Sequence, residues 1–142
     1  MWLDHTVSLF LTGGVAEKAD VLSVFLLGGP FRFHSELPLI LHGYNEGEIF
    51  ARQFVLVNAS YQLAPIPGVD WLRLQFSGDY ARVVFFPGYS LPHHNLTSAG
   101  VDVITAVTKR ATLVFGYGYG FDAPRGDHAG AQEAHILFEH KF

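Results

Sequence analysis

The sequence predicts an all-β fold of antiparallel strands, and three observations lead to this prediction. Apolar and polar residues alternate with a period of two in several segments, as they do in a strand with one apolar face. Clusters of glycine and proline separate these segments, which is typical of strand connections. No segment has the run of about 18 apolar residues that a transmembrane helix needs. The chain is therefore expected to form seven or eight strands in a single domain, 1–142.

The expected strands follow one another along the chain with turns between them. The alternating segments are 5–12, 52–63, 70–82, 111–121 and 131–142, with shorter ones at 21–27 and 99–107 and an eighth possible at 37–41. Turns are expected at 13–14, 28–30, 65–68, 87–88 and 124–127. The connection from Gly29 to Ala51 is the longest, and long connections commonly carry function.

One expected strand, Ala111–Phe121, has an almost empty face. Large apolar residues such as Phe115 alternate there with Gly116, Gly118 and Gly120. Such a face suits a strand whose inner surface is crowded by a loop or a plug.

The composition favours a sheet that faces lipid. Charged residues make up 15%, below the roughly 25% of soluble domains, and aromatic residues also make up 15%. A soluble lipocalin-like ligand-binding barrel would instead carry polar outer faces. The net charge of −4 argues against a nucleic-acid partner, and the lack of cysteine excludes disulfides and thiolate chemistry. We therefore expect an antiparallel transmembrane β-barrel, or part of one.

The end of the chain resembles the terminal strand of bacterial outer-membrane barrels, which closes on an aromatic residue after alternating apolar positions. One face of this segment consists of Ala134, Ile136, Phe138, His140 and Phe142. The resemblance implies that Ile136, Phe138 and Phe142 form an assembly signal for the barrel assembly machinery. It also implies a location in the bacterial outer membrane.

The segment Leu41-His42-Gly43-Tyr44 resembles the Arg-Gly-Phe/Tyr loop motif of the bacterial surface-antigen outer-membrane β-barrel superfamily. That superfamily includes the insertases, the two-partner-secretion transporters and the patatin-like outer-membrane proteins. A Leu27-Gly28-Gly29 turn precedes the motif, the segment Ala59-Ser60-Tyr61 follows it, and a glycine-rich strand comes next to last, all in the family's order. The resemblance covers most of this chain and matches the C-terminal half of the family's barrel.

The resemblance implies that the Gly29–Ala51 loop folds into the barrel lumen and packs on the inner wall. This chain has His42 where the family has arginine, and Asp79 is the expected acidic partner in the lumen. A His–Asp contact in this position would depend on pH. The family's barrel also has about twice as many strands as this chain supplies. An eight-stranded barrel, a barrel shared between subunits, and a segment of a longer protein all fit, and the resemblance favours half of a larger barrel.

Catalytic and metal-binding patterns are weak. The segment 88–92 lacks the second glycine of a G-x-S-x-G nucleophile elbow. His94 and Ser98 allow an alternative, a small eight-stranded outer-membrane lipid hydrolase, but a polar turn is the simpler interpretation. The histidines show no two-ligand spacing on a helix, so neither a metal nor a cofactor is expected. Glu133, His135, Glu139 and Lys141 share one face and are expected to form an ion network rather than an acid–base pair.

We therefore expect a non-enzymatic outer-membrane wall protein whose inward loop supports protein insertion, transport or surface display. Its expected partners are outer-membrane lipid, the barrel assembly machinery, and further copies or other subunits that complete the barrel. The alternatives are the lipid hydrolase and the soluble lipocalin-like barrel.

Overall fold

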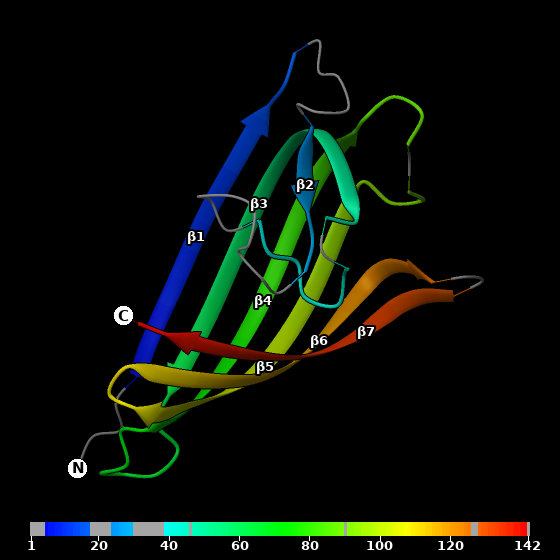
Figure 1. Ribbon diagram of the computed structural model, residues 1–142. Coiled ribbons are helices and arrows are strands. Elements are labelled where there is room, and N and C mark those ends of the chain that lie inside the picture. The colour runs from blue at the N-terminus through cyan, green and yellow to red at the C-terminus, as the bar shows by residue number, and fades with distance from the viewer. Residues whose placement is uncertain are drawn as a thin grey trace.

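The chain folds into one antiparallel sheet (Figure 1). The structure is a computed structural model, and it describes residues 5–17, 24–29, 39–45, 47–89, 91–125 and 128–141. Within these ranges there are seven strands, which confirms the expected all-β class. The strands are β1 (His5–Val15), β2 (Phe25–Leu27), β3 (Ile49–Leu63), β4 (Leu72–Phe85), β5 (Asn95–Thr108), β6 (Ala111–Arg125) and β7 (His128–His140). In the same ranges, no helix is long and apolar enough to cross a membrane.

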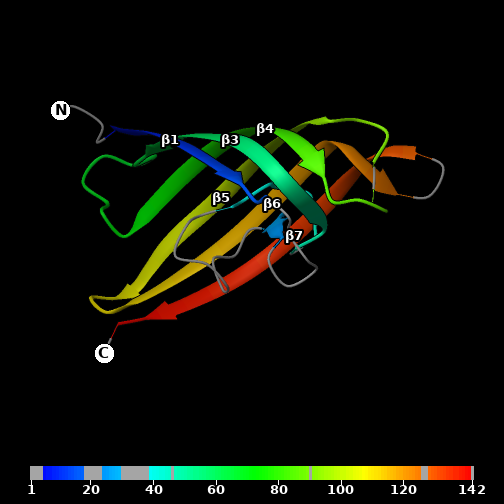
Figure 2. The same ribbon diagram turned by 90° about the horizontal axis from the view of Figure 1, so that it is seen from above.

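The sheet is open and strongly curved. Its strand order is β1-β3-β4-β5-β6-β7, and every neighbouring pair is antiparallel. The short β2 pairs with the start of β3 and so continues the edge that β1 forms. Figure 2 shows the sheet as a trough, with β1 and β7 along opposite sides and residues 39–45, drawn in cyan, between them.

The convex and concave faces of the sheet differ in polarity in two adjacent rows that run across all six long strands. One row across six strands is apolar and points to the convex side: Val7, Tyr61, Phe76, Val101, Tyr117 and Ala134. The next row is small or polar and points to the concave side: Ser8, Ser60, Ser77, Gly100, Gly118 and Glu133. Because side chains alternate along a strand, each face keeps its residues along the trough, and the concave face changes from small and polar in these rows to apolar in the rows of Leu56, Ala81 and Leu96.

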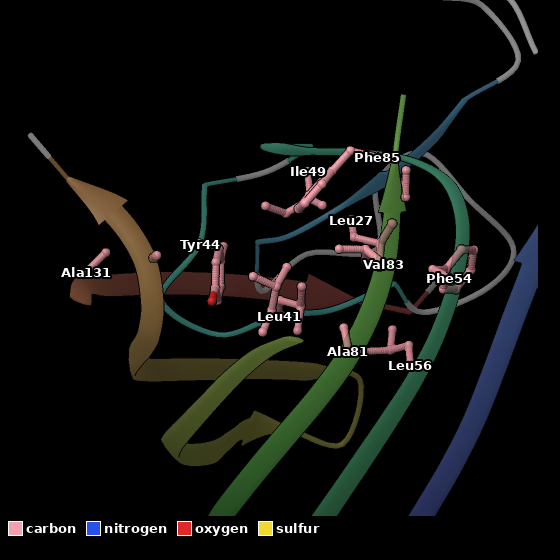
Figure 3. Close-up of a cluster of buried hydrophobic side chains, with 13 residues drawn as sticks. Leu27, Leu41, Tyr44, Ile49, Phe54, Leu56, Ala81, Val83, Phe85 and Ala131 are labelled. Carbon is pink, nitrogen blue, oxygen red and sulfur yellow. The ribbon is translucent and has the colours of Figure 1, made fainter. Parts of the chain in front are cut away.

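The hydrophobic core lies on the concave face, at one end of the trough (Figure 3). Leu27 and Leu41, from the segments before β3, pack against side chains of β3 and β4. The strands contribute Phe54, Leu56, Ala81 and Val83, all buried. The core therefore fixes residues 41–44 on the inner side of the sheet.

The Gly13-Gly14 turn expected from the sequence was wrong, because both glycines lie inside β1. A Cβ atom on Gly14 would lie 2.7 Å from ring carbons of Phe25 and Phe54. Glycine is used here for the close approach of two aromatic rings, not for a turn.

Other boundaries also differ from the sequence prediction. Residues 39–40 are not in a strand, and Leu41 makes only an isolated bridge with Gly29. Pro124 and Arg125 belong to β6 instead of a turn. β5 begins at Asn95, four positions before the expected start. Residues 21–23, 30–38, 126–127 and 142 lie outside the described ranges, so the expectations for them remain untested.

Replacement of Leu56 by alanine is expected to lower the free energy of unfolding by about 2–5 kcal/mol, because Leu56 is fully buried in the core. Its neighbour Val55 points to the convex face, 49% exposed. V55A is therefore the matched control and should lower the free energy of unfolding far less. Thermal unfolding of both variants under the same conditions tests this, and equal losses of unfolding free energy would contradict the placement of the core.

Candidate functional site

The candidate site is the loop motif Leu41–Tyr44, which lies on the concave face of the sheet. Leu41 and Tyr44 are fully buried, and between them the chain turns through Gly43 at a φ of 75°. The Tyr44 N–H donates to the Leu41 carbonyl at 3.4 Å, which closes the turn. A left-handed φ favours glycine, so this tight turn accounts for the residue type at position 43.

His42 binds to β4 through both its backbone and its ring. The ring Nδ1 lies 2.6 Å from Oδ2 of Asp79, and the backbone N–H donates to the same oxygen at 3.1 Å. The ring Nε2 lies 3.2 Å from the Ser77 hydroxyl. The structure thus brings together the loop histidine and the acidic residue that the sequence pointed to.

Asp79 is buried, and its carboxylate is held by donors from several elements. The Asn58 amide of β3 donates to Oδ1 at 2.7 Å, and the Ser98 hydroxyl of β5 donates to Oδ2 at 2.7 Å. The same Asn58 amide also donates to the Ile40 carbonyl at 2.9 Å. A buried carboxylate is stable only when its oxygens are hydrogen-bonded or paired, and this set of donors meets that requirement.

The pKa of His42 reflects two opposing effects. Burial lowers it, but the hydrogen bond and the charge of Asp79, with smaller contributions from Asp102 and Glu133, outweigh burial and raise it above its ordinary value. The protonated ring then donates from both nitrogens, one to Asp79 and the other to Ser77. The contact is therefore strongest as an ion pair with the charged histidine.

The glycine face of β6 accommodates the loop. A Cβ atom on Gly118 would lie 2.8 Å from the backbone nitrogen of Gly43 and 2.9 Å from Cβ of His42. One on Gly120 would lie 2.7 Å from the Tyr44 ring. In the other direction, a Cβ on Gly43 would clash with the backbone nitrogen of Gly120. The loop and the strand pack backbone to backbone, as the empty face of this strand indicated.

A second polar group connects the loop to β7. The Gly43 N–H donates to Oε2 of Glu133 at 3.0 Å, and Glu133 Oε1 lies 3.2 Å from Nδ1 of His135. His135 Nε2 in turn lies 3.2 Å from Oδ1 of Asp102 on β5. Glu133 and His135 form part of the ion network expected from the sequence, whereas Asp102 was not singled out there.

The other residues named from the sequence lie elsewhere. Ile136 and Phe138 are on the convex face of β7, 67% and 61% exposed, and so do not contact the loop motif from the concave side. Ser98 donates to Asp79, whereas His94 Nδ1 lies 3.1 Å from the Val83 carbonyl. The hydrolase pair suggested by the sequence thus has separate partners. Asn58 was not named as a site residue, and its only sequence signal is that it faces the same side as Asp79.

Ser77, His42 and Asp79 stand in the order of an acyl-transfer triad, with contacts of 3.2 and 2.6 Å. Acyl transfer also requires hydrogen-bond donors aimed at the developing oxyanion. Ser77 and its neighbour Gly78 lie mid-strand, paired with β3 on one side and β5 on the other, so their N–H groups belong to the sheet. The arrangement holds the loop on the concave face of the sheet.

Comparison of the chain with protein-family models, with curated proteins and with solved structures gives no match in any of the three. The resemblance to the surface-antigen barrel therefore rests on the sequence motifs.

G118A is expected to displace the loop, because the added methyl group meets the Gly43 backbone at 2.8 Å. The free energy of unfolding should fall by about 1–3 kcal/mol, and hydrogen exchange at residues 41–44 should become faster. Gly78 is the matched control, since a Cβ there meets nothing within 4 Å. If G78A and G118A change exchange in the loop equally, the loop does not pack on Gly118.

The D79N variant is expected to lower the pKa of His42 by removing the charge that raises it. Because the folded-state pKa is raised, this contact contributes fully below the unfolded pKa of about 6.5 and is lost as pH rises through the folded value. A histidine NMR titration measures the shift. D122N is the control, because Asp122 accepts from Thr97 and does not contribute to the pKa of His42. An unchanged His42 pKa in D79N would contradict the ion pair.

Proposed function

We propose that this chain is a wall segment of a bacterial outer-membrane β-barrel, with the loop motif Leu41–Tyr44 bound to its inner face. In this role it supports protein insertion, transport or surface display and carries no catalysis of its own. The observation that carries the proposal is the set of exposed apolar side chains on the convex face, opposite a concave face that holds buried ionisable side chains beside the hydrophobic core.

Apolar side chains are exposed on the convex face from one edge of the sheet to the other, and Arg82 and Asn95, in the row of Val55, also point outward. Large apolar side chains that point outward include Val7, Leu9, Leu11, Val55, Phe76, Val101, Phe115, Tyr117, Ile136 and Phe138, each more than one third exposed. Soluble monomers rarely expose an apolar patch of this extent. Such a face is stable against lipid chains, and the outward side of a membrane barrel has this composition.

The concave face supplies the other half of the argument. It places Asp79, Asp102 and Glu133 on the inside of the trough. The loop binds Asp79 and Glu133, and Asp102 contacts His135 of β7. In a membrane barrel, polar and ionisable groups belong to the interior, where they can pair or meet water. A lipocalin-like barrel would instead have an apolar ligand cavity and a polar exterior.

Partners follow from the surfaces of the sheet. Outer-membrane lipid would cover the convex face, and further strands would pair with β1 and β7 at the open edges. The resemblance assigns β7, with Ile136, Phe138 and Phe142, as the strand that the barrel assembly machinery binds. Phe142 lies outside the described residues. The same resemblance supports the loop as the element that gates or braces the lumen.

Neighbouring positions on β1 test the proposal at nearly equal depth in the membrane. Leu9 points outward, 71% exposed, whereas Ser8 points to the concave side. L9K is expected to lower the stability in lipid vesicles by about 2–4 kcal/mol, because it places a charge in hydrocarbon. S8K, the matched control, should be tolerated because its charge reaches the lumen.

The measurement is the fraction of each variant that folds into vesicles. This fraction is obtained from the difference in electrophoretic migration between boiled and unboiled samples. Equal yields for the two variants would contradict the lipid-facing assignment. A chain that folds and stays in solution without detergent would overturn the membrane proposal as a whole.

A further inference from the structure

We propose that His135 is a pH-dependent latch for one end of the loop motif. The charged ring holds Glu133 in position to accept from the Gly43 N–H, and the neutral ring releases it. The inference deepens the proposed function, in which the loop braces the lumen, and rests on that function for its consequence. The latch itself is a property of the folded sheet, so it can be measured in any medium in which the chain folds.

His135 reaches across an intervening strand to meet Asp102. In the register of the sheet, Asp102 of β5 lies opposite Gly116 of β6, and Gly116 lies opposite His135 of β7. A Cβ atom on Gly116 would clash with the His135 ring and with Oδ1 of Asp102. The missing side chain at this position therefore lets side chains of β5 and β7 meet over β6.

The ring of His135 lies between two carboxylates, and we call Asp102, His135 and Glu133 the His135 cluster. Nε2 lies 3.2 Å from Oδ1 of Asp102, Nδ1 lies 3.2 Å from Oε1 of Glu133, and each of the three side chains is at most 15% exposed. A neutral imidazole has one N–H and one lone pair, so it would turn a lone pair toward one of the carboxylates. The charged ring carries an N–H on both nitrogens. The contacts on the two sides of the ring therefore fit the charged form.

Two carboxylate oxygens of the cluster depend on that charge. Among the described residues, neither Asp102 Oδ1 nor Glu133 Oε1 has a well-aligned hydrogen-bond donor. The second oxygen of each carboxylate has one: the Gln75 amide donates to Asp102 Oδ2 at 3.3 Å, and the Gly43 N–H donates to Glu133 Oε2 at 3.0 Å. A buried carboxylate oxygen without a donor destabilises the fold unless a positive charge lies beside it. Loss of the charge on His135 would therefore destabilise both carboxylates in their present positions.

Other charged groups also face the His135 cluster. Arg73 of β4 and Glu139 of β7 lie on the same concave face. His42 of the loop is close enough to both carboxylates of the cluster for their charges to act on it. β6 adds no charge, because it presents a glycine under the ring. The response to pH therefore has two candidate histidines, and the experiment must separate them.

The two ends of the loop differ in what they lose when a histidine becomes neutral. A neutral His42 can still donate from Nδ1 to Asp79 and accept at Nε2 from Ser77, so that end loses the ion pair but keeps its hydrogen bonds. A neutral His135 leaves one carboxylate beside it without a donor. Histidine changes its charge between about pH 5 and pH 8. In the proposed barrel, a rise in pH through this range would free the Gly43 end of the loop first.

The Gly43 N–H reports on the latch directly. Its protection against hydrogen exchange, corrected for the intrinsic effect of pH on exchange, is expected to fall several-fold from about pH 6 to about pH 8. In H135Q, whose side chain is polar but cannot become charged, this protection should be low at both pH values. H94Q is the matched control, because His94 contacts the Val83 carbonyl and the Phe85 ring. H94Q should keep the response of the unaltered chain.

G116A gives a second test that leaves every residue of the His135 cluster in place. Its methyl group would meet the ring and the Asp102 carboxylate, and no loop atom is among the three atoms nearest to it. It should nevertheless lower the protection of the Gly43 N–H, and by more than that of the His42 N–H at the other end of the loop. G78A, which adds a methyl group in open space, should change neither amide.

Three results would overturn the latch. The first is a Gly43 N–H whose protection is the same at both pH values. The second is an H135Q variant that keeps the full pH response, since His42 would then account for it. The third is a G116A variant with unchanged protection at Gly43. The wall function fails separately: a chain that folds in solution without detergent would overturn it, while the same exchange measurement on that sample still decides the latch.

Discussion

The arrangement of the loop on the sheet depends on one carboxylate, that of Asp79. It accepts hydrogen bonds from His42 of the loop, from Asn58 of β3 and from Ser98 of β5, and it belongs to β4 itself. A buried carboxylate without hydrogen bonds would destabilise the fold, so the carboxylate of Asp79 depends on these donors. A single side chain thereby fixes the positions of four segments on the concave face, and the hydrophobic core packs beside it.

The strands were readable from the sequence because their two faces differ in polarity. Alternation over 52–63 and 111–121 predicted β3 and β6 in their central parts. The same reasoning failed at Gly13-Gly14, since glycine marks both turns and close packing. Only the rings of Phe25 and Phe54, brought in by the fold, distinguish the two uses. The start of β5 was also missed, because residues 95–98 contain a single large apolar side chain, Leu96, and so show no alternation.

The site was readable in part. A motif pointed to His42 and to an acidic partner, and the glycine positions of β6 indicated a crowded inner face. Asn58 and Asp102 carry no local signal, because each is a single polar residue at an alternate position of a strand. The pairing register of the strands, which the local sequence does not reveal, brings the site residues together. Asn58, Asp79 and Ser98 lie directly opposite one another on adjacent strands, and cross-strand neighbours on one face interact.

The loop reaches from Asp79 on β4 to Glu133 on β7, and so spans three successive strand pairings of the sheet. Because the loop is bound at both points, it fixes the curvature of the sheet between β4 and β7. In a closed barrel the arc per strand determines how many strands complete the circle and how wide the interior is. In the barrel proposed above, the length of this short turn, set by the left-handed Gly43, would therefore help to determine the circumference.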